Sequence, residues 1–129
     1  MNLLLEFSDS EVAQVEQLDG SLRVRFSAAC VVRTAASSQP PVQGYAQSVE
    51  LLIFGARSTE ALAGLIGRVA HGRIAATERW ATRLALPCRI DGPVQLELGF
   101  ANHGTLNVTG DGVACRFTGE PNFGESLAC

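Results

Sequence analysis

An alternation of apolar and polar residues with a period of two, broken by short turn motifs, is the feature that most limits the fold of this chain. The clearest example follows Asp19-Gly20, where Leu22, Val24 and Phe26 alternate with polar residues. Successive side chains of a strand point to opposite faces, so this pattern indicates a strand with one buried face. Asp-Gly is a strong signal for a two-residue hairpin loop, because both residues suit a tight turn.

The loop at Asp19-Gly20 also predicts which residues face each other in the hairpin. The predicted pairs put apolar residues on one face and opposite charges on the other: Val15 with Val24, Ala13 with Phe26, and Glu16 with Arg23. A helix over 9–17, capped by Ser8 with Glu11, is the competing interpretation. It leaves the Asp-Gly turn without a hairpin, so we favour the strand.

The remainder of the first half predicts further strands around one loop. Residues 28–32 break the alternation, which suggests a bulge or a strand buried on both faces. Residues 34–44 are small, polar and contain a proline pair, so we expect a flexible loop there. Residues 45–54 predict a central strand, because both of its faces carry apolar side chains.

One segment, residues 58–70, has the periodicity of a short helix. Its apolar residues recur at helical spacing: Leu62, Leu65, Ile66 and Val69. Gly64 and Gly67 weaken this prediction, since each costs about 1 kcal/mol relative to alanine inside a helix. The alternative is a loop that leads into a strand at 68–76.

From Trp80 onward the pattern predicts an antiparallel meander that holds the core. Turns are expected at 90–93, 101–104 and 109–112, where glycine, aspartate, asparagine or proline cluster. Leu98 lies well inside one of these strands and should be among the most buried residues.

The fold class that these patterns predict is mainly β, or α+β if the single short helix is counted. We expect an antiparallel barrel, roll or sandwich of about eight strands with a C-terminal meander. A chain of 129 residues forms one domain, which we place at 1–118. Residues 119–129 are expected to be a loosely held tail.

Charge and hydropathy exclude several classes of partner. The net charge is −3 and all ten basic residues are arginine, so we expect no nucleic-acid binding and no lysine chemistry. No apolar run approaches the length of a membrane span, and we expect no membrane association. The first residues carry no basic segment, so a signal peptide is not expected. A small bacterial protein of the cytoplasm fits these features.

The four cysteines show no metal-binding pattern. Cys30, Cys88, Cys115 and Cys129 are widely spaced and include no C-x-x-C pair. We therefore expect no metal, no cofactor and free thiols in a reducing compartment, although the even number leaves a disulfide open. Cys129, as the terminal residue, should be the most reactive thiol.

The residues that are candidates for chemistry all have simpler explanations. His103, Asp91 and Asp111 lie in predicted turns, which favour such residues for their backbone angles. His71 is expected to end the short helix, and Trp80 to be a large core residue. No pattern supplies a nucleophile with an orienting acid. We therefore assign no catalytic, cofactor-binding or metal-binding residue from the sequence.

Three hypotheses of function remain. The first is a non-catalytic protein-interaction module, which self-associates as a homo-oligomer through an edge strand or docks a partner. The second is a β-barrel that binds a small ligand of unknown identity. The third is a hydrolase-like enzyme that uses His103 with Asp111 or Asp91, which makes catalysis the less favoured class.

Overall fold

The computed structural model is all-β over the residues that it describes, which are 2–34, 42–46, 48–56, 61–118, 123 and 124. These residues form ten strands and no helix, and every pairing is antiparallel. The mainly β prediction is confirmed. In chain order the strands are β1 (Asn2–Leu18), β2 (Ser21–Thr34), β3 (Val42–Ala46), β4 (Val49–Phe54), β5 (Gly67–Ala76), β6 (Arg79–Ala81), β7 (Arg83–Ala85), β8 (Cys88–Phe100), β9 (Thr105–Phe117) and β10 (Phe123–Gly124).

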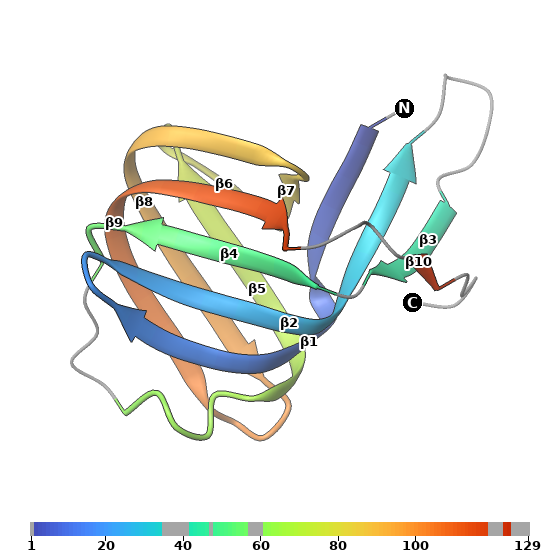
Figure 1. Cartoon of the computed structure of the whole chain (residues 1–129), viewed down its shortest axis with the longest axis horizontal. Coiled ribbons are helices and arrows are strands. Elements are labelled where there is room, and N and C mark those ends of the chain that lie inside the picture. The colour runs from blue at the N-terminus through green and yellow to red at the C-terminus, as the bar shows by residue number, and fades with distance from the viewer. Residues whose placement is uncertain (1, 35–41, 47, 57–60, 119–122, 125–129) are drawn as a thin grey trace.

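Six of the strands close into a barrel, as Figure 1 shows. The order around the barrel is β1, β2, β4, β9, β8 and β5, and β5 pairs back onto β1. Closure pairs these strands on both sides, which removes the exposed edges of an open sheet. Of the three architectures that the sequence left open, the chain therefore adopts the barrel.

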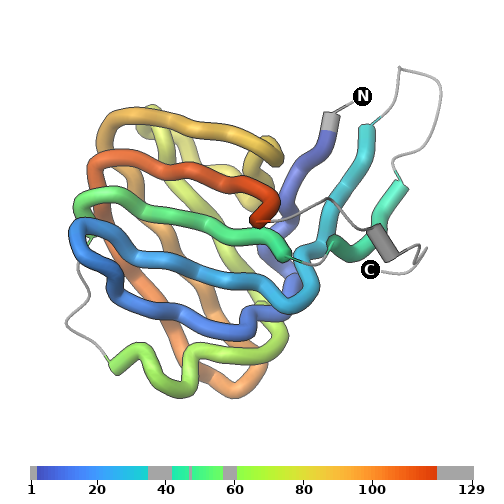
Figure 2. Tube along the Cα trace, in the orientation of Figure 1, coloured from blue at the N-terminus to red at the C-terminus, as the bar shows by residue number. Residues whose placement is uncertain are grey.

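The strands β1 and β2 each belong to two parts of the molecule. Their hairpin lies in the barrel wall, whereas their other halves leave the wall together and pair with β7 and β3 (Figure 2). The bend in β1 falls at Asp9, which has a φ of 68°, beside a register shift between Glu6 and Glu11. The buried Ser10 hydroxyl fills this break: it donates to the Glu6 carbonyl at 2.6 Å and accepts from the Cys30 N–H at 2.8 Å.

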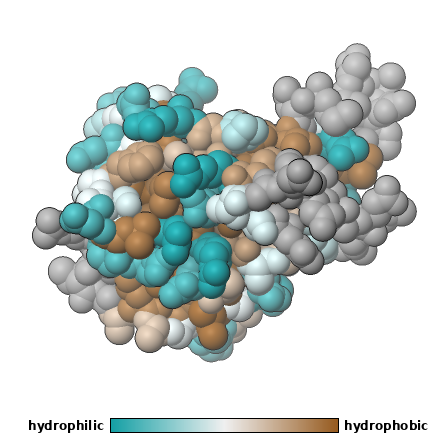
Figure 3. All heavy atoms as spheres, in the orientation of Figure 1, coloured by the Kyte–Doolittle hydropathy of each residue, from teal (hydrophilic) through white to brown (hydrophobic). Residues whose placement is uncertain are grey.

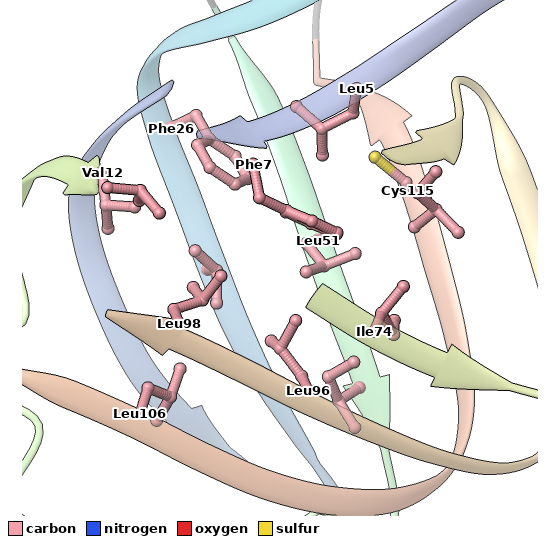
Figure 4. Packing of buried hydrophobic residues seen from close by; sticks show 14 of the residues in the cluster. Leu5, Phe7, Val12, Phe26, Leu51, Ile74, Leu96, Leu98, Leu106 and Cys115 are labelled. Atoms are coloured by element: carbon pink, nitrogen blue, oxygen red, sulfur yellow. The ribbon is translucent and has the colours of Figure 1, made fainter. Parts of the chain in front are cut away.

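The barrel interior is filled by aliphatic and aromatic side chains from the surrounding strands (Figure 4). Leu22, Val24 and Phe26 are all buried, as the alternation predicts. Leu98 is also buried as predicted, and it lies opposite Leu106 of β9. Small barrels are filled by their own side chains, and the buried cluster fills this one.

The predicted hairpin forms around Asp19-Gly20. Val15 faces Val24 and Glu16 faces Arg23, as expected from a two-residue loop. Gly20 has a φ of 78°, a value that glycine adopts without steric cost.

One predicted pair of this hairpin is wrong. Phe26 faces Val12 rather than Ala13, because the register shifts between Val12 and Gln14. Such a bulge places an extra residue in one strand and increases its local twist. The bulge keeps Val12 buried and leaves Ala13 exposed.

The helix predicted over 58–70 is wrong where the structure describes this segment. Residues 61–66 form a turn, and β5 begins at Gly67, as in the alternative of a loop leading into a strand. Gly64 and Gly67 have φ values of 95° and 94°, which a right-handed helix does not allow. The apolar residues of this segment do not form one helical face. Leu65 and Val69 are buried in the core, whereas Ile66 is 51% exposed.

Two of the three predicted C-terminal turns are also wrong. The strand β8 runs through 90–93 and β9 runs through 109–112. The turn at 101–104 does form, where the His103 N–H donates to the Phe100 carbonyl at 2.9 Å.

The glycines at the two missing turns have other roles. Gly92, with a φ of 111°, lies in a bulge between Asp91 and Val94. At Gly110 an added Cβ would lie 2.5 Å from both an Ile53 methyl and the Phe54 carbonyl oxygen. These glycines let long strands coil and approach their neighbours closely.

The remaining expectations concern 34–54 and the tail. The predicted strand over 45–54 is divided into β3 and β4, with β4 central between β2 and β9. Of the predicted loop, residue 34 ends β2 and residues 42–44 begin β3, while 35–41 lie outside the described residues. Within 119–129, Phe123 and Gly124 form β10 against β3, and the rest lies outside the described residues.

Candidate functional site

The residues proposed for a hydrolase do not come together. His103 lies in the turn that joins β8 to β9, with a φ of 72°. Asp91 lies toward the other end of the same pair of strands, opposite Gly112, and the Asp111 carboxylate occupies the space that a side chain at Gly55 would take. At about 3.3 Å per residue, His103 is more than about 20 Å away from Asp111 along β9. A His103–Asp catalytic pair is therefore not assembled.

An open pocket of about 500 Å³ lies on the outer wall across β5, β8 and β9, and we call it the outer groove. Six of its eight lining residues are polar, but most of its accessible surface comes from apolar atoms, and its floor is made of a buried glycine and a buried leucine. The lining residues are His71, Gly72, Arg73, Thr82, Glu97, Leu98, Thr105 and Asn107.

The strand register explains why these side chains converge. Arg73 of β5 faces Glu97 of β8, which in turn faces Asn107 of β9. Directly paired residues in antiparallel strands present their side chains on the same face. The three side chains therefore form one polar row across the outer wall.

A second row lies beside the first and depends on a glycine. His71 of β5 faces Gly99 of β8, which faces Thr105 of β9. The imidazole lies directly over Gly99, where a Cβ would overlap it. The missing side chain at 99 therefore lets His71 lie flat against the wall instead of standing away from it.

Arg73 is held in place by two contacts. Its Nε donates to Glu97 Oε2 at 2.8 Å, and its guanidinium lies 4.0 Å from the centre of the Trp80 ring. Stacking on an aromatic face and an ion pair to a carboxylate both restrict a guanidinium. Arg73 is therefore a preorganised donor at the edge of the groove.

Four side chains of the outer groove have no protein partner. Among the residues that the structure describes, the side chains of His71, Thr82, Thr105 and Asn107 have no hydrogen-bonding or ionic partner. Together they offer both donors and acceptors. The groove can therefore hydrogen-bond a polar molecule without breaking an existing contact.

The sequence analysis did not identify this site. Trp80, expected in the core, is 43% exposed on β6, and His71, expected to end a helix, is in the middle of β5. The strand is interrupted at Thr82, between β6 and β7. The Trp80 side chain therefore does not share the face on which Leu84 packs into the core. The alternative prediction, a strand at 68–76, is the one that indicates this site. Alternate residues of a strand share a face, so it places His71 and Arg73 together.

A second polar cluster, which we call the charge ladder, crosses β1, β2, β4 and β9 on another part of the wall, where Figure 3 shows a hydrophilic band. Glu50 is only 3% exposed. It accepts from Arg116 Nε at 2.6 Å and lies 3.8 Å from Arg23 Nη1. Arg23 also bonds to Glu16. Every residue of this ladder therefore has a partner, although the buried Nε of Arg23 has no hydrogen-bond partner.

The described residues contain no cluster of three or more histidine, cysteine or acidic side chains that could hold a metal ion. Over the same residues, no helix has the length and apolar character needed to cross a membrane. Comparison of the chain with protein families, with characterised proteins and with solved structures finds no match.

Proposed function

We propose that this protein is a non-catalytic binding module, and that the outer groove takes a small neutral polar ligand with both hydrogen-bond donors and acceptors. The observation that carries the proposal is the convergence of His71, Thr105 and Asn107, each without a side-chain partner among the described residues, beside the fixed Arg73–Glu97 pair. These side chains are exposed, so a ligand would replace water and not a protein partner at each of them.

The size of the groove supports a small molecule as the ligand. Its volume of about 500 Å³ lies within the range of roughly 300–1,000 Å³ that is usual for small-molecule sites. Saccharides and compact amides have this size, and their adjacent donors and acceptors match the lining.

Charge supports a neutral ligand over a phosphate or a dicarboxylate. Arg73 is the only arginine among the lining residues, and Glu97 forms an ion pair with it at 2.8 Å. An anion would therefore meet both a guanidinium and a carboxylate, so its attraction to one is offset by repulsion from the other.

The arrangement of the groove favours binding over catalysis. A histidine that acts as a general base is usually oriented by a carboxylate. The carboxylate of this groove, Glu97, bonds to Arg73 instead, and His71 lies against Gly99. The side chains are therefore placed to hold a ligand rather than to transfer its protons.

Calorimetric titration tests the proposal. The probes are a panel of neutral monosaccharides and short amides, with inorganic phosphate and succinate as anionic comparisons. Thr105→Ala or Asn107→Ala should weaken binding of a neutral compound by about 2–10-fold, the loss of one hydrogen bond. Thr109→Ala is the matched control, because Thr109 is also exposed on β9 but does not line the groove. Binding of anions alone, binding of nothing, or an equal effect of all three variants would contradict the proposal.

Self-association is a second candidate, and the exposure of Trp80 favours it. Among the described strands, β6 pairs only with β5, so its other side offers backbone groups to a second copy. A tryptophan that is 43% exposed beside such an edge is typical of an interface anchor. Sedimentation of the wild-type protein and of Trp80→Ser tests this: a dimer that Trp80→Ser dissociates supports it, and a monomer at high concentration contradicts it.

We propose the reducing cytoplasm of a bacterium as the location of this module. The thiols of Cys88 and Cys115, which form no disulfide in this structure, support a reducing compartment. Fractionation of the native host would test it, and recovery of the protein from an oxidising compartment would contradict it.

A further inference from the structure

Two cysteines that are far apart in the sequence are direct neighbours in the barrel. Cys88, the first residue of β8, lies opposite Cys115 of β9. Paired residues of antiparallel strands have Cα atoms about 4.5–5.5 Å apart. A disulfide accepts Cα separations of about 4.4–6.8 Å. The backbone therefore already has the spacing that a bond between these two residues needs.

Their side chains lie on the same face of the wall, because the two residues are directly paired. Cys115 is part of the hydrophobic core, and Cys88 packs against that core. The two groups are close enough that a charge on Cys88 raises the pKa of Cys115. Both residues are free thiols in this structure. The pair thus has proximity and shared orientation as well as spacing.

The two thiols differ in their access to solvent. Cys88 is partly exposed, whereas Cys115 is completely buried. A reagent in solution therefore reaches Cys88 first, and Cys115 can react only with a sulfur that Cys88 already carries. This order is the one in which an attacking and a resolving cysteine operate.

We propose that Cys88 and Cys115 form an oxidative modification site, a dithiol that closes to an intramolecular disulfide by exchange with a small-molecule disulfide such as glutathione disulfide. In the first step the Cys88 thiolate attacks the disulfide, forming a mixed disulfide and releasing one glutathione thiolate. In the second step the Cys115 thiolate attacks the Cys88 sulfur and expels the second glutathione. The protein loses two protons and two electrons, and the disulfide reagent is reduced to two thiols.

The environment of the pair makes this reaction slow. Burial raises the pKa of Cys88, partly offset by the hydrogen bond from Cys115. Burial also raises the pKa of Cys115, and a negative charge on Cys88 raises it further. The thiolate is the nucleophile, so only a small fraction of each sulfur is reactive at neutral pH. The site therefore stays reduced under ordinary conditions and closes on long exposure to the oxidant.

Cys30 provides an internal control for this chemistry. It is buried on β2, where its neighbours in the register are Glu6 of β1 and Tyr45 of β3. Neither neighbour is a cysteine, so the same treatment should leave Cys30 as a thiol. The proposal is independent of the outer groove, because Cys88, Cys115 and Cys30 do not line it.

The test is incubation of folded Cys129→Ser protein with glutathione disulfide, followed by alkylation, non-reducing digestion and mass spectrometry. Removing the terminal thiol prevents links between chains at that residue. We expect a protein lighter by two hydrogen atoms, with a crosslinked peptide pair containing Cys88 and Cys115, and with Cys30 alkylated. A glutathione adduct that persists on Cys88, a crosslink involving Cys30, or full alkylation of both cysteines would overturn the proposal.

A second variant separates the two steps. In Cys115→Ala the resolving thiol is absent, so Cys88 should accumulate the glutathione adduct instead of the internal bond. Circular dichroism checks that the Cys115→Ala variant is folded. If it is not, the peptide map of the Cys129→Ser protein still tests the proposal. Failure of Cys88 to form an adduct in folded Cys115→Ala would contradict its role as the attacking thiol.

Discussion

The charge ladder and the outer groove are both polar rows across the outer wall of one barrel, yet they differ in how completely their side chains are partnered. In the ladder, Glu50 is buried between Arg116 and Arg23, and Arg23 continues to Glu16. In the groove, the Arg73–Glu97 pair is half exposed and lies beside side chains without partners in the described structure. Strand register can assemble a polar row of either kind. The ladder joins its charged side chains to one another and leaves the Arg23 Nε unpaired, whereas the groove leaves whole side chains without a protein partner among the described residues.

The core beneath the groove should give the largest effect. Leu98 forms part of the groove floor and is 2% exposed, so Leu98→Ala leaves a cavity and should lower the free energy of unfolding by about 2–5 kcal/mol. Chemical denaturation measures this change. If Leu98→Ala lowered the free energy of unfolding by less than an exposed substitution such as Thr109→Ala, the Leu98 side chain would point away from the core.

The two carboxylates test the contrast between the rows directly. Glu50→Ala should cost about 1–3 kcal/mol of unfolding free energy, because it removes the hydrogen-bond partner of Arg116 and one of the two carboxylates that pair with the partly buried Arg23. This cost lies below the upper limit for breaking a buried ion pair, because the Arg116 side chain is 60% exposed.

Glu97→Ala is the matched change in the groove. Its ion pair with Arg73 is partly exposed, so the expected cost is below about 1 kcal/mol. Denaturation midpoints of the two variants, measured together, decide the matter. Equal costs would mean that the groove pair is as structural as the ladder.

Gly99→Ala should change the groove with little change in stability. The added methyl overlaps the exposed His71 ring, which can swing away from the wall. We expect a cost under about 1 kcal/mol, together with a clear shift of the His71 ring resonances in NMR spectra. A large loss of stability with unchanged His71 resonances would show that the backbone, and not the imidazole, absorbs the clash.

Local patterns predicted what local interactions determine. The hairpin around Asp19-Gly20, the inward face of β2 and the burial of Leu98 follow from turn chemistry and alternation. The turns at 90–93 and 109–112 were wrong because their glycines serve bulges and close contacts between strands. Such contacts depend on neighbours distant in the sequence, and a single sequence does not reveal them.

The outer groove was missed for the same reason. Glu97 lies between two strands whose residues complete its row, Arg73 of β5 and Asn107 of β9. The helical spacing of 58–70 concealed the strand that carries His71 and Arg73. Closing a barrel from β5 onto β1 is a long-range event, and it is this closure that brings the site together.

The most direct test of ligand binding at the outer groove is a backbone amide NMR titration of the labelled protein with the neutral compound that binds best in calorimetry. We expect chemical-shift changes at His71, Arg73, Glu97, Thr105 and Asn107. The amide resonances of the ladder residues Glu16, Arg23, Glu50 and Arg116 should not change. Shifts concentrated on the ladder, or no shift with any member of the neutral panel, would contradict the claim that unpartnered polar side chains mark the binding surface of this barrel.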